Sequence, residues 1–232
     1  MPVCSGCLAE PEPFEAEHVC VACRTPFRNA FPLDEEGRCG LCRRGLTGYD
    51  AAYSYGAYEG RLRGLIHLYK YGRIETLAGP LANLLAAAYP RDQRFDLIAP
   101  VPLHWRRRWQ RGFNQAELLA RRLGERLGIP ARGVLRRRRP TRSQSGLSNA
   151  ARRANVAGAF ELKARTGVRG LRVLLVDDVL TTGASAGACA RALKQAGARH
   201  VAVLTVARAD RRFPAGGGTT VPGPDSFALG AP

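Results

Sequence analysis

The stretch from Asp177 to Ser185 places two adjacent carboxylates just before a short turn of hydroxyl and glycine residues. Carboxylates such as Asp177 and Asp178 accept hydrogen bonds from the hydroxyls of a sugar. Gly183 lets the backbone approach an anion closely, and the start of a following helix adds N–H donors and a positive dipole end. These residue types, in this order, predict a pocket for a phosphorylated ribose.

The predicted phosphate loop comprises Val179, Leu180, Thr181, Thr182, Gly183, Ala184 and Ser185. The two threonines and the serine supply hydroxyls beside the backbone donors. A simpler interpretation is that the acids and threonines only cap a helix, because Asp and Thr are good N-cap residues. The string is much longer than capping requires, so we favour the pocket.

The elements around this loop predict a βαβ unit of a parallel sheet. Residues 172–176 form an apolar strand, residues 184–195 a helix of small residues and residues 200–207 a second apolar strand. Ligands of such sheets bind beyond the carboxyl ends of the strands, which is where Asp177 and Asp178 lie. Cys189, on the small-residue face of the helix, is predicted to be buried.

Upstream segments supply the rest of an α/β domain. The predicted elements are a strand and turn over 48–60, helices over 61–69, 74–88 and 114–127, a buried strand over 96–101 and another strand over 129–135. Residues 136–155 are polar and basic and predict a long mobile loop, whereas the Gly- and Pro-rich residues 213–232 predict a disordered tail. The expected organisation is therefore a cysteine-rich module over 1–48, an α/β domain over 49–212 and the tail.

Six of the seven cysteines form three CxxC pairs within the first 42 residues. Cys20 and Cys23 are followed after fifteen residues by Cys39 and Cys42, a spacing typical of a tetrahedral four-thiolate zinc site. A closed site of this kind has no open position for a substrate, so the zinc is expected to be structural. An alternative set joins Cys4 and Cys7 to the 20/23 pair across twelve residues; we favour the first set.

Charge is distributed unevenly along the chain. The formal net charge is +17, and the first 50 residues carry eight acidic and five basic side chains, which leaves +20 on the remainder. Fifteen arginines fall within residues 104–153, a density that favours binding of a polyanion. The alternative is an arginine-rich surface that only keeps helices solvated.

Candidate nucleic-acid contacts lie within this basic region. They are Trp105, Arg106, Arg107, Arg108, Trp109, Arg136, Arg137, Arg138 and Arg139. The two tryptophans suit stacking on bases beside phosphate contacts, although they equally suit packing in a core. No run of 18 apolar residues and no apolar leader are present, so we expect a cytoplasmic protein without a membrane span.

The string VLLVDDVLTTGAS resembles the phosphoribosyl-binding signature of type I phosphoribosyltransferases. The resemblance implies a twisted parallel sheet flanked by helices, here preceded by a small zinc-ribbon-like Cys4 module. It also implies 5-phosphoribosyl 1-pyrophosphate bound with Mg²⁺, with Asp177 and Asp178 as catalytic residues. Pro100, Val101 and Pro102 match the loop that touches the pyrophosphate in that family, and the mobile loop over 136–155 matches the one that closes over the ligand.

Several further motifs resemble the ComF family of competence proteins, with its ComFC-like and GntX-like members. They are CVACRTP, CGLC, EGRLRGLIHLYKYGR, PVPLHWRRRWQRGFNQAELLA and TRSQSGLSNAARRANVAGAF, in this order. By motif position the resemblance adds the candidate site residues Lys70, Arg111, Asn114, Gln115, Gln144 and Asn155. Lys70 could instead be an ordinary surface residue, and Asn114 could also cap a helix.

The family resemblance implies a role in natural transformation, in which single-stranded DNA is handled at the inner face of the membrane with a ComFA-like helicase. The first hypothesis is therefore a binding module for DNA uptake that has a phosphoribosyl pocket. The second is an active phosphoribosyltransferase acting on an unidentified nitrogenous acceptor. A regulator that responds to phosphoribosyl pyrophosphate ranks third, because no helix-turn-helix is visible.

Overall fold

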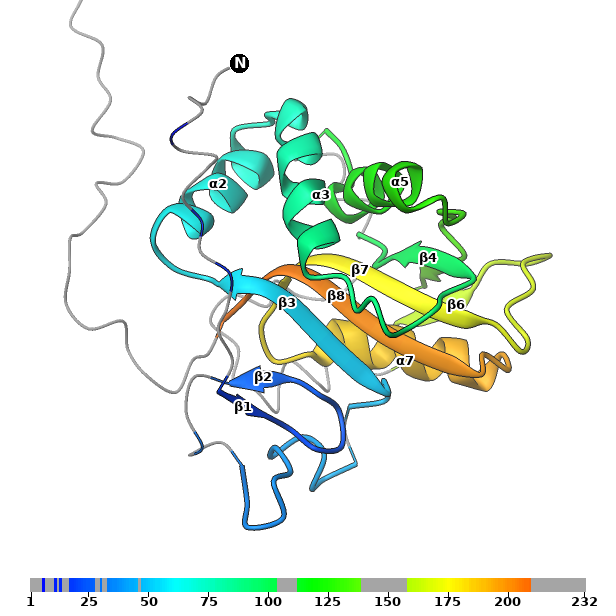
Figure 1. Ribbon diagram of the computed structural model, residues 1–232. Coiled ribbons are helices and arrows are strands. Elements are labelled where there is room, and N and C mark those ends of the chain that lie inside the picture. The colour runs from blue at the N-terminus through cyan, green and yellow to red at the C-terminus, as the bar shows by residue number, and fades with distance from the viewer. Residues whose placement is uncertain are drawn as a thin grey trace, which may run out of the picture.

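The structure is a computed structural model that describes residues 6, 11, 13, 17–27, 30, 33–45, 47–103, 112–138 and 158–209. Its centre is a parallel sheet in the order β3-β8-β7-β4 (Figure 1). The strands are β3 (Ala51–Ala57), β8 (His200–Arg208), β7 (Arg172–Leu180) and β4 (Leu97–Pro100). The central strands β7 and β8 are apolar almost throughout, as expected for strands buried on both faces.

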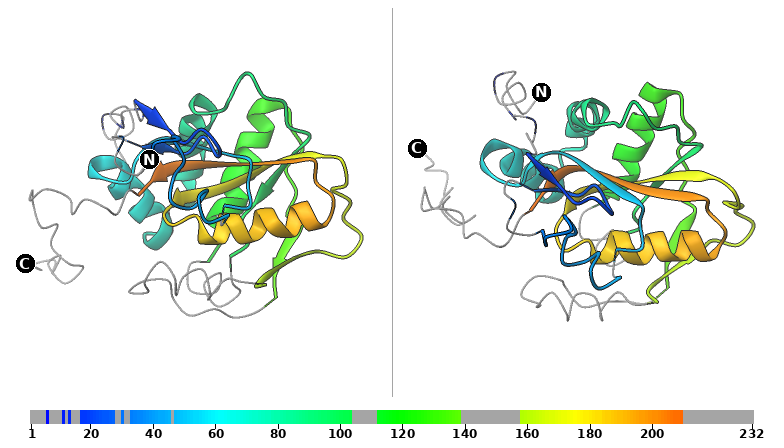
Figure 2. Two further views of the ribbon diagram at one scale, coloured as in Figure 1. Left: turned by 90° about the horizontal axis from the view of Figure 1, so that it is seen from below. Right: turned by 60° about the horizontal axis from the view of Figure 1, so that its bottom comes forward.

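Helices cover both faces of this sheet (Figures 1 and 2). One face carries α2 (Gly60–Tyr71), the short 3-10 helix η1 (Glu75–Leu77), α3 (Ala78–Ala87) and α5 (Gln115–Leu127). The other face carries α7 (Ala184–Gln195). Each face has its own apolar cluster, and the sheet residues alternate between the two clusters, as the pleat requires.

The predicted βαβ unit and the upstream strands and helices are confirmed, with two corrections. Strand β7 continues through Asp177 and Asp178 to Leu180, because β8 pairs with it along its whole length. The strand predicted over 129–135 forms only as a single parallel bridge of Ala131 with Ile98 of β4, in which the Ile98 N–H donates to the Pro130 carbonyl and the Arg132 N–H to the Ile98 carbonyl. Pro130 has no N–H for a longer ladder, and the strand that forms in this region is β5 (Leu135–Arg137), which pairs antiparallel with β6 (Phe160–Leu162).

The cysteine module packs directly on the α7 face of the sheet. It contains the antiparallel strands β1 (His18–Val19) and β2 (Pro26–Phe27), and the Ala52 N–H of β3 donates to the Cys23 carbonyl at 2.8 Å. Cys20, Cys23 and Cys39 are buried in the same apolar cluster as α7 and the sheet. The module and the sheet therefore share one core.

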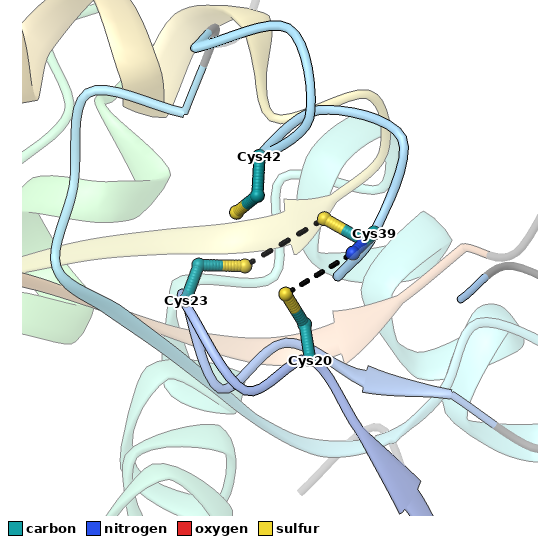
Figure 3. A group of neighbouring side chains, drawn as sticks. All are labelled: Cys20, Cys23, Cys39 and Cys42. Atoms are coloured by element: carbon teal, nitrogen blue, oxygen red, sulfur yellow. Dashed lines mark hydrogen bonds between the residues drawn. The ribbon is translucent and has the colours of Figure 1, made fainter. Parts of the chain in front are cut away.

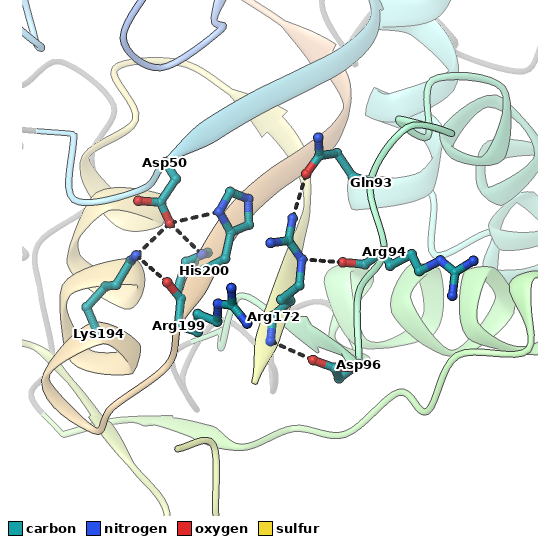
Figure 4. Close-up of polar contacts among 9 residues, drawn as sticks. Asp50, Gln93, Arg94, Asp96, Arg172, Lys194, Arg199 and His200 are labelled. Atoms are coloured by element: carbon teal, nitrogen blue, oxygen red, sulfur yellow. Dashed lines mark hydrogen bonds and ion pairs between the residues drawn. The ribbon is translucent and has the colours of Figure 1, made fainter. Parts of the chain in front are cut away.

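Ion pairs tie the amino edge of the sheet together (Figure 4). Asp50 pairs with Lys194 at 2.6 Å and accepts the Val201 N–H at 2.7 Å. The Arg172 side chain donates to the Arg94 carbonyl and its N–H to Asp96. This edge is occupied by structural contacts, which leaves the carboxyl edge for a ligand.

No helix in the described part of the chain combines the length and the apolar character needed to cross a membrane.

Candidate functional site

The two carboxylates lie in the last residues of β7, at the carboxyl edge of the sheet. Consecutive strand residues point to opposite faces, so Asp178 faces α2 and Asp177 faces the α7 side. The Asp178 N–H donates to an Asp177 carboxylate oxygen at 2.9 Å, and Asp178 is buried. The pair thus offers oxygen acceptors on both sides of one strand end.

Lys70 of α2 holds the inner carboxylate. Its Nζ lies 2.8 Å from Asp178 Oδ1, and the two side chains are only 14% and 11% exposed. Burial alone would lower the pKa of Lys70, but the charges of Asp178 and Asp177 outweigh it and the pKa is raised. Lys70 is therefore a charged member of the carboxylate cluster, and the simple surface interpretation of this residue is wrong.

The aromatic residue before Lys70 fixes α2 to the start of α5. The Tyr69 hydroxyl donates to the Gln115 carbonyl at 2.9 Å, and its ring packs against Phe113 with centroids 5.3 Å apart. Gln115 is buried, and Asn114 occupies the N-cap position of α5 without a side-chain cap hydrogen bond. Of the two motif residues, Gln115 thus joins α5 to the helix that carries Lys70, whereas Asn114 stands at the N-cap position without the side-chain hydrogen bond of a cap.

The segment predicted as the phosphate loop contains a three-residue turn, Thr181, Thr182 and Gly183, between β7 and α7. Val179 and Leu180 end β7, and Ala184 and Ser185 begin α7. Gly183 is the N-cap residue and has a left-handed backbone, with φ 69°. The Ala184 N–H donates to Thr182 Oγ1 at 3.3 Å, and the three loop residues are partly exposed. The turn therefore presents hydroxyls and the start of a twelve-residue helix at the sheet edge.

The predicted pyrophosphate-contact segment lies beside the acids. Pro100 pairs with Val176, and the Val101 N–H donates to the Val176 carbonyl at 2.9 Å. Val101 and Pro102 thus leave β4 next to the point where β7 reaches Asp177. The fold brings this segment, the carboxylates, Lys70 and the phosphate loop to one edge.

Exchange of Gly183 for alanine is expected to weaken phosphate binding. A Cβ there would lie 3.0 Å from Tyr49 Oη, and the left-handed backbone adds about 1–2 kcal/mol of strain. Gly128→Ala is the matched control, since Gly128 has φ +68° and no atom within 4 Å of a Cβ. Chemical denaturation should show a similar loss of stability in both variants, and calorimetry should show weaker phosphate-ligand binding in Gly183→Ala alone. Equal ligand affinity in the two variants would contradict the assignment of this loop.

Four cysteine sulfurs gather where the module meets the sheet (Figure 3). The Sγ atoms of Cys20, Cys23, Cys39 and Cys42 all lie within 4.8 Å of one another, so among the described cysteines the fold assembles the favoured set. Cys23 Sγ and Cys39 Sγ are 3.8 Å apart. A tetrahedral zinc with Zn–S bonds of about 2.3 Å places its sulfurs about 3.8 Å apart, so the donors fit a metal.

The surroundings of the sulfurs also suit thiolate ligands. The Cys39 N–H donates to Cys20 Sγ at 3.2 Å, the kind of contact that stabilises a metal-bound thiolate. The hydrogen bond with Cys23 lowers the pKa of Cys39 and raises that of Cys23. Cys189, by contrast, is fully buried in α7 away from this set, as predicted.

Some predicted site residues lie outside the described residues. They are Cys4, Cys7, Trp105, Arg106, Arg107, Arg108, Trp109, Arg111, Arg139, Gln144 and Asn155, together with most of the predicted mobile loop and the tail. The described arginines Arg136, Arg137 and Arg138 lie on or next to β5. Sequence reasoning missed Leu41 of the cysteine module and Tyr49, just after it, which lie beside Gly183, because no local pattern marks a contact made through the fold.

Comparison with known proteins places this geometry in a family. The Phosphoribosyl transferase domain family matches residues 110–216. Competence protein F of Haemophilus influenzae is 32% identical over 215 residues, which span 89% of this chain and 90% of that protein. DNA utilization protein YhgH of Salmonella typhi is 35% identical over 73% of this chain and 77% of that protein.

Among solved structures, the glutamine phosphoribosylpyrophosphate amidotransferase from B. subtilis is 24% identical over 56% of this chain and 26% of that chain, with a TM-score of 0.39. The relatives similar over most of the chain confirm the resemblance carried by the motifs. The chain therefore belongs to the competence protein F family and contains a phosphoribosyl transferase domain.

Proposed function

We propose that this protein binds 5-phosphoribosyl 1-pyrophosphate, or a nucleotide with the same ribose phosphate, and acts in DNA uptake. The observation that carries the proposal is the pair Asp177 and Asp178 at the end of β7, followed by the turn to α7 at the left-handed Gly183. In this arrangement the carboxylates accept hydrogen bonds from the ribose hydroxyls, while the turn and the helix N-terminus bind the 5-phosphate. Val101 and Pro102 face the pyrophosphate.

A divalent cation fits the same edge. The two carboxylates are oxygen donors of the kind that Mg²⁺ prefers, and Mg²⁺ commonly binds through one or two carboxylates plus substrate phosphates. Bound with the ligand, Mg²⁺ would neutralise the pyrophosphate charge. In the cysteine module, four soft thiolates select zinc over harder cations, so we assign zinc there as a structural ion.

Single-stranded DNA is the proposed macromolecular partner. The relatives are named a competence protein and a DNA utilization protein, and the residues after 50 carry a net charge of +20. On the described surface, Arg136 and Arg138 are 62% and 71% exposed and share the single carboxylate Glu161, which leaves a net positive charge there. A surface of this sign attracts phosphates by counterion release.

Phosphoribosyl transfer is the second candidate, favoured by the match to the Phosphoribosyl transferase domain family. In that reaction the C1–O bond to pyrophosphate breaks, a bond from C1 to an acceptor nitrogen forms, and the acceptor loses a proton. The protein would contribute mainly positioning and electrostatic stabilisation. Release of pyrophosphate with a panel of nitrogenous bases distinguishes this activity from binding alone.

The double variant Asp177→Ala/Asp178→Ala is expected to bind 5-phosphoribosyl 1-pyrophosphate with Mg²⁺ at least about 100-fold more weakly than the wild type in calorimetry. Two lost hydrogen bonds to charged groups, at about 1.5–3 kcal/mol each, correspond to that factor. Asp92→Ala is the matched control, because Asp92 is an exposed carboxylate on the loop before β4, at the amino edge.

Both variants are expected to keep their affinity for single-stranded DNA, and that affinity should fall steeply between about 50 and 200 mM salt. Loss of transformation in cells that carry the double variant would connect the pocket to DNA uptake. Absence of any phosphoribosyl pyrophosphate binding by the wild type, with Mg²⁺ present, would refute the pocket. DNA affinity that is insensitive to salt would refute the basic surface.

A further inference from the structure

The predicted phosphate loop rests on two side chains, Leu41 of the cysteine module and Tyr49, which joins the module to β3. A Cβ at Gly183 would lie 3.0 Å from Tyr49 Oη and 3.7 Å from Leu41 Cδ1. Leu41 belongs to the turn between Cys39 and Cys42, so its position depends on how these two cysteines are held. The backbone of the loop is thus covered by Leu41 of the module and by Tyr49, which lies between the module and β3.

Tyr49 lies between the sulfur cluster and the loop. It is 5% exposed and belongs to the apolar cluster that also contains Cys23 and Ala184. Cys23 Sγ lies 2.9 Å from the Thr25 hydroxyl, which in turn interacts with the Tyr49 hydroxyl. Burial raises the pKa of Tyr49, so its hydroxyl stays protonated. Tyr49 therefore packs in the same core as a metal-ligand sulfur and places its hydroxyl beside Gly183.

A second contact fixes the same segment of the module to the helix behind the loop. Gly48 has φ +71°, and a Cβ there would lie 2.7 Å from the Gly187 carbonyl oxygen of α7. The backbones of Gly48 and the first turns of α7 therefore touch directly. The position of Tyr49 is set by this contact on one side and by the sulfur cluster on the other.

From these contacts we infer that Tyr49 and Leu41 are positioning residues of the phosphate loop, and that the metal-bound cysteine module holds the loop in the shape that receives the phosphate. This inference rests on the proposed function only in that it takes the loop to be the phosphate site. The support is mechanical, since Leu41 of the module places an apolar contact against the turn and Tyr49, just after the module, places a hydroxyl against it. It predicts that changes in the module alter the loop even when the metal stays bound.

The test compares Tyr49→Phe and Leu41→Ala, prepared with zinc, with the wild type. Val21→Ala is the control, because Val21 belongs to the module but is 66% exposed. Its side chain lies beside Gly37 and is not among the nearest neighbours of Gly183. Hydrogen exchange at the amides of residues 181–184, zinc content and the affinity for 5-phosphoribosyl 1-pyrophosphate with Mg²⁺ are measured for each. In both test variants, exchange at these amides should rise and affinity should fall by up to about 10-fold, equivalent to about 1.4 kcal/mol of lost support, at full zinc content. Val21→Ala should match the wild type.

Unchanged exchange in both Tyr49→Phe and Leu41→Ala would overturn the inference, whatever the ligand does. Loss of zinc from both variants would also overturn it, since the residues would then act on the module and not on the loop. If the wild type fails to bind the ligand while exchange rises in the two variants, the proposed function is refuted and the positioning role stands. The two proposals therefore fail separately.

Discussion

Removal of the metal from the four-cysteine set is expected to unfold the module around Cys20, Cys23, Cys39 and Cys42. In its described residues the module has two strands of two residues each and few buried apolar side chains, so we expect that packing cannot replace the metal. Comparable structural zinc sites have apparent binding energies of about 10–16 kcal/mol, as large as the whole net stability of a typical domain. Loss of the ion should therefore exceed what the module can tolerate.

The effect should extend to the sheet, because the buried cysteines share one apolar cluster with α7 and the central strands. Exposure of that face should lower the melting temperature of the chain by about 10 °C or more, at about 2–4 °C for each kcal/mol lost in a protein of this size. The measurement is thermal unfolding with and without a chelator, together with the metal content.

Cys39→Ala should reproduce the effect of the chelator, and Cys189→Ala is its matched control. Cys189 is fully buried in α7 but lies outside the sulfur set, so its exchange should leave metal content unchanged and cost little stability. A melting temperature that does not respond to the chelator, in protein shown to contain metal, would contradict a structural role for the ion.

The parts of the molecule that the sequence predicts are those set by local patterns. Strand β7, α7 and β8 follow from uninterrupted apolar runs separated by a turn that contains Gly183. The set of four sulfurs follows from two CxxC pairs whose spacing is typical of one tetrahedral zinc site. In each case a short pattern of neighbouring residues supplies the signal.

The parts that the sequence does not predict depend on contacts between distant segments. The ion pair of Lys70 with Asp178 joins α2 to β7, and the contact of Leu41 with Gly183 joins the module to the loop. The sequence does not predict the bounds of β5, because its partner β6 lies beyond a long intervening stretch and a three-residue strand carries little pattern. Motif position pointed to Lys70, but only the fold gives its partner.

The exchange of Lys70 for methionine is expected to be the most damaging single substitution on the α2 side of the site. It keeps the apolar stem of the side chain and removes the ammonium that pairs with Asp178, a carboxylate only 11% exposed. Removal of one partner of a buried ion pair costs about 3–5 kcal/mol, because the other charge stays buried without its counterion. Asp177, next in the chain, adds repulsion to that cost.

Lys194→Met is the matched control at the opposite edge of the sheet. Lys194 pairs with Asp50 at 2.6 Å, but these side chains are 32% and 37% exposed (Figure 4). Pairs that solvent reaches contribute about 0–1 kcal/mol, so this variant should lose far less stability in chemical denaturation. Equal losses of stability in the two lysine variants would show that the burial of Asp178 does not raise the cost of removing its counterion.

The double variant Lys70→Met/Asp178→Asn should recover part of the stability lost in Lys70→Met, because no uncompensated charge then remains at that position. The coupling free energy from the double-mutant cycle should fall at the upper end of the usual range of about 0.5–3 kcal/mol. Millimolar Mg²⁺ should stabilise Lys70→Met more than the wild type, since a cation beside the two carboxylates would take over the role of the ammonium. A coupling energy near zero would mean that Lys70 and Asp178 act independently, and the cation at this edge would then have to come with the ligand.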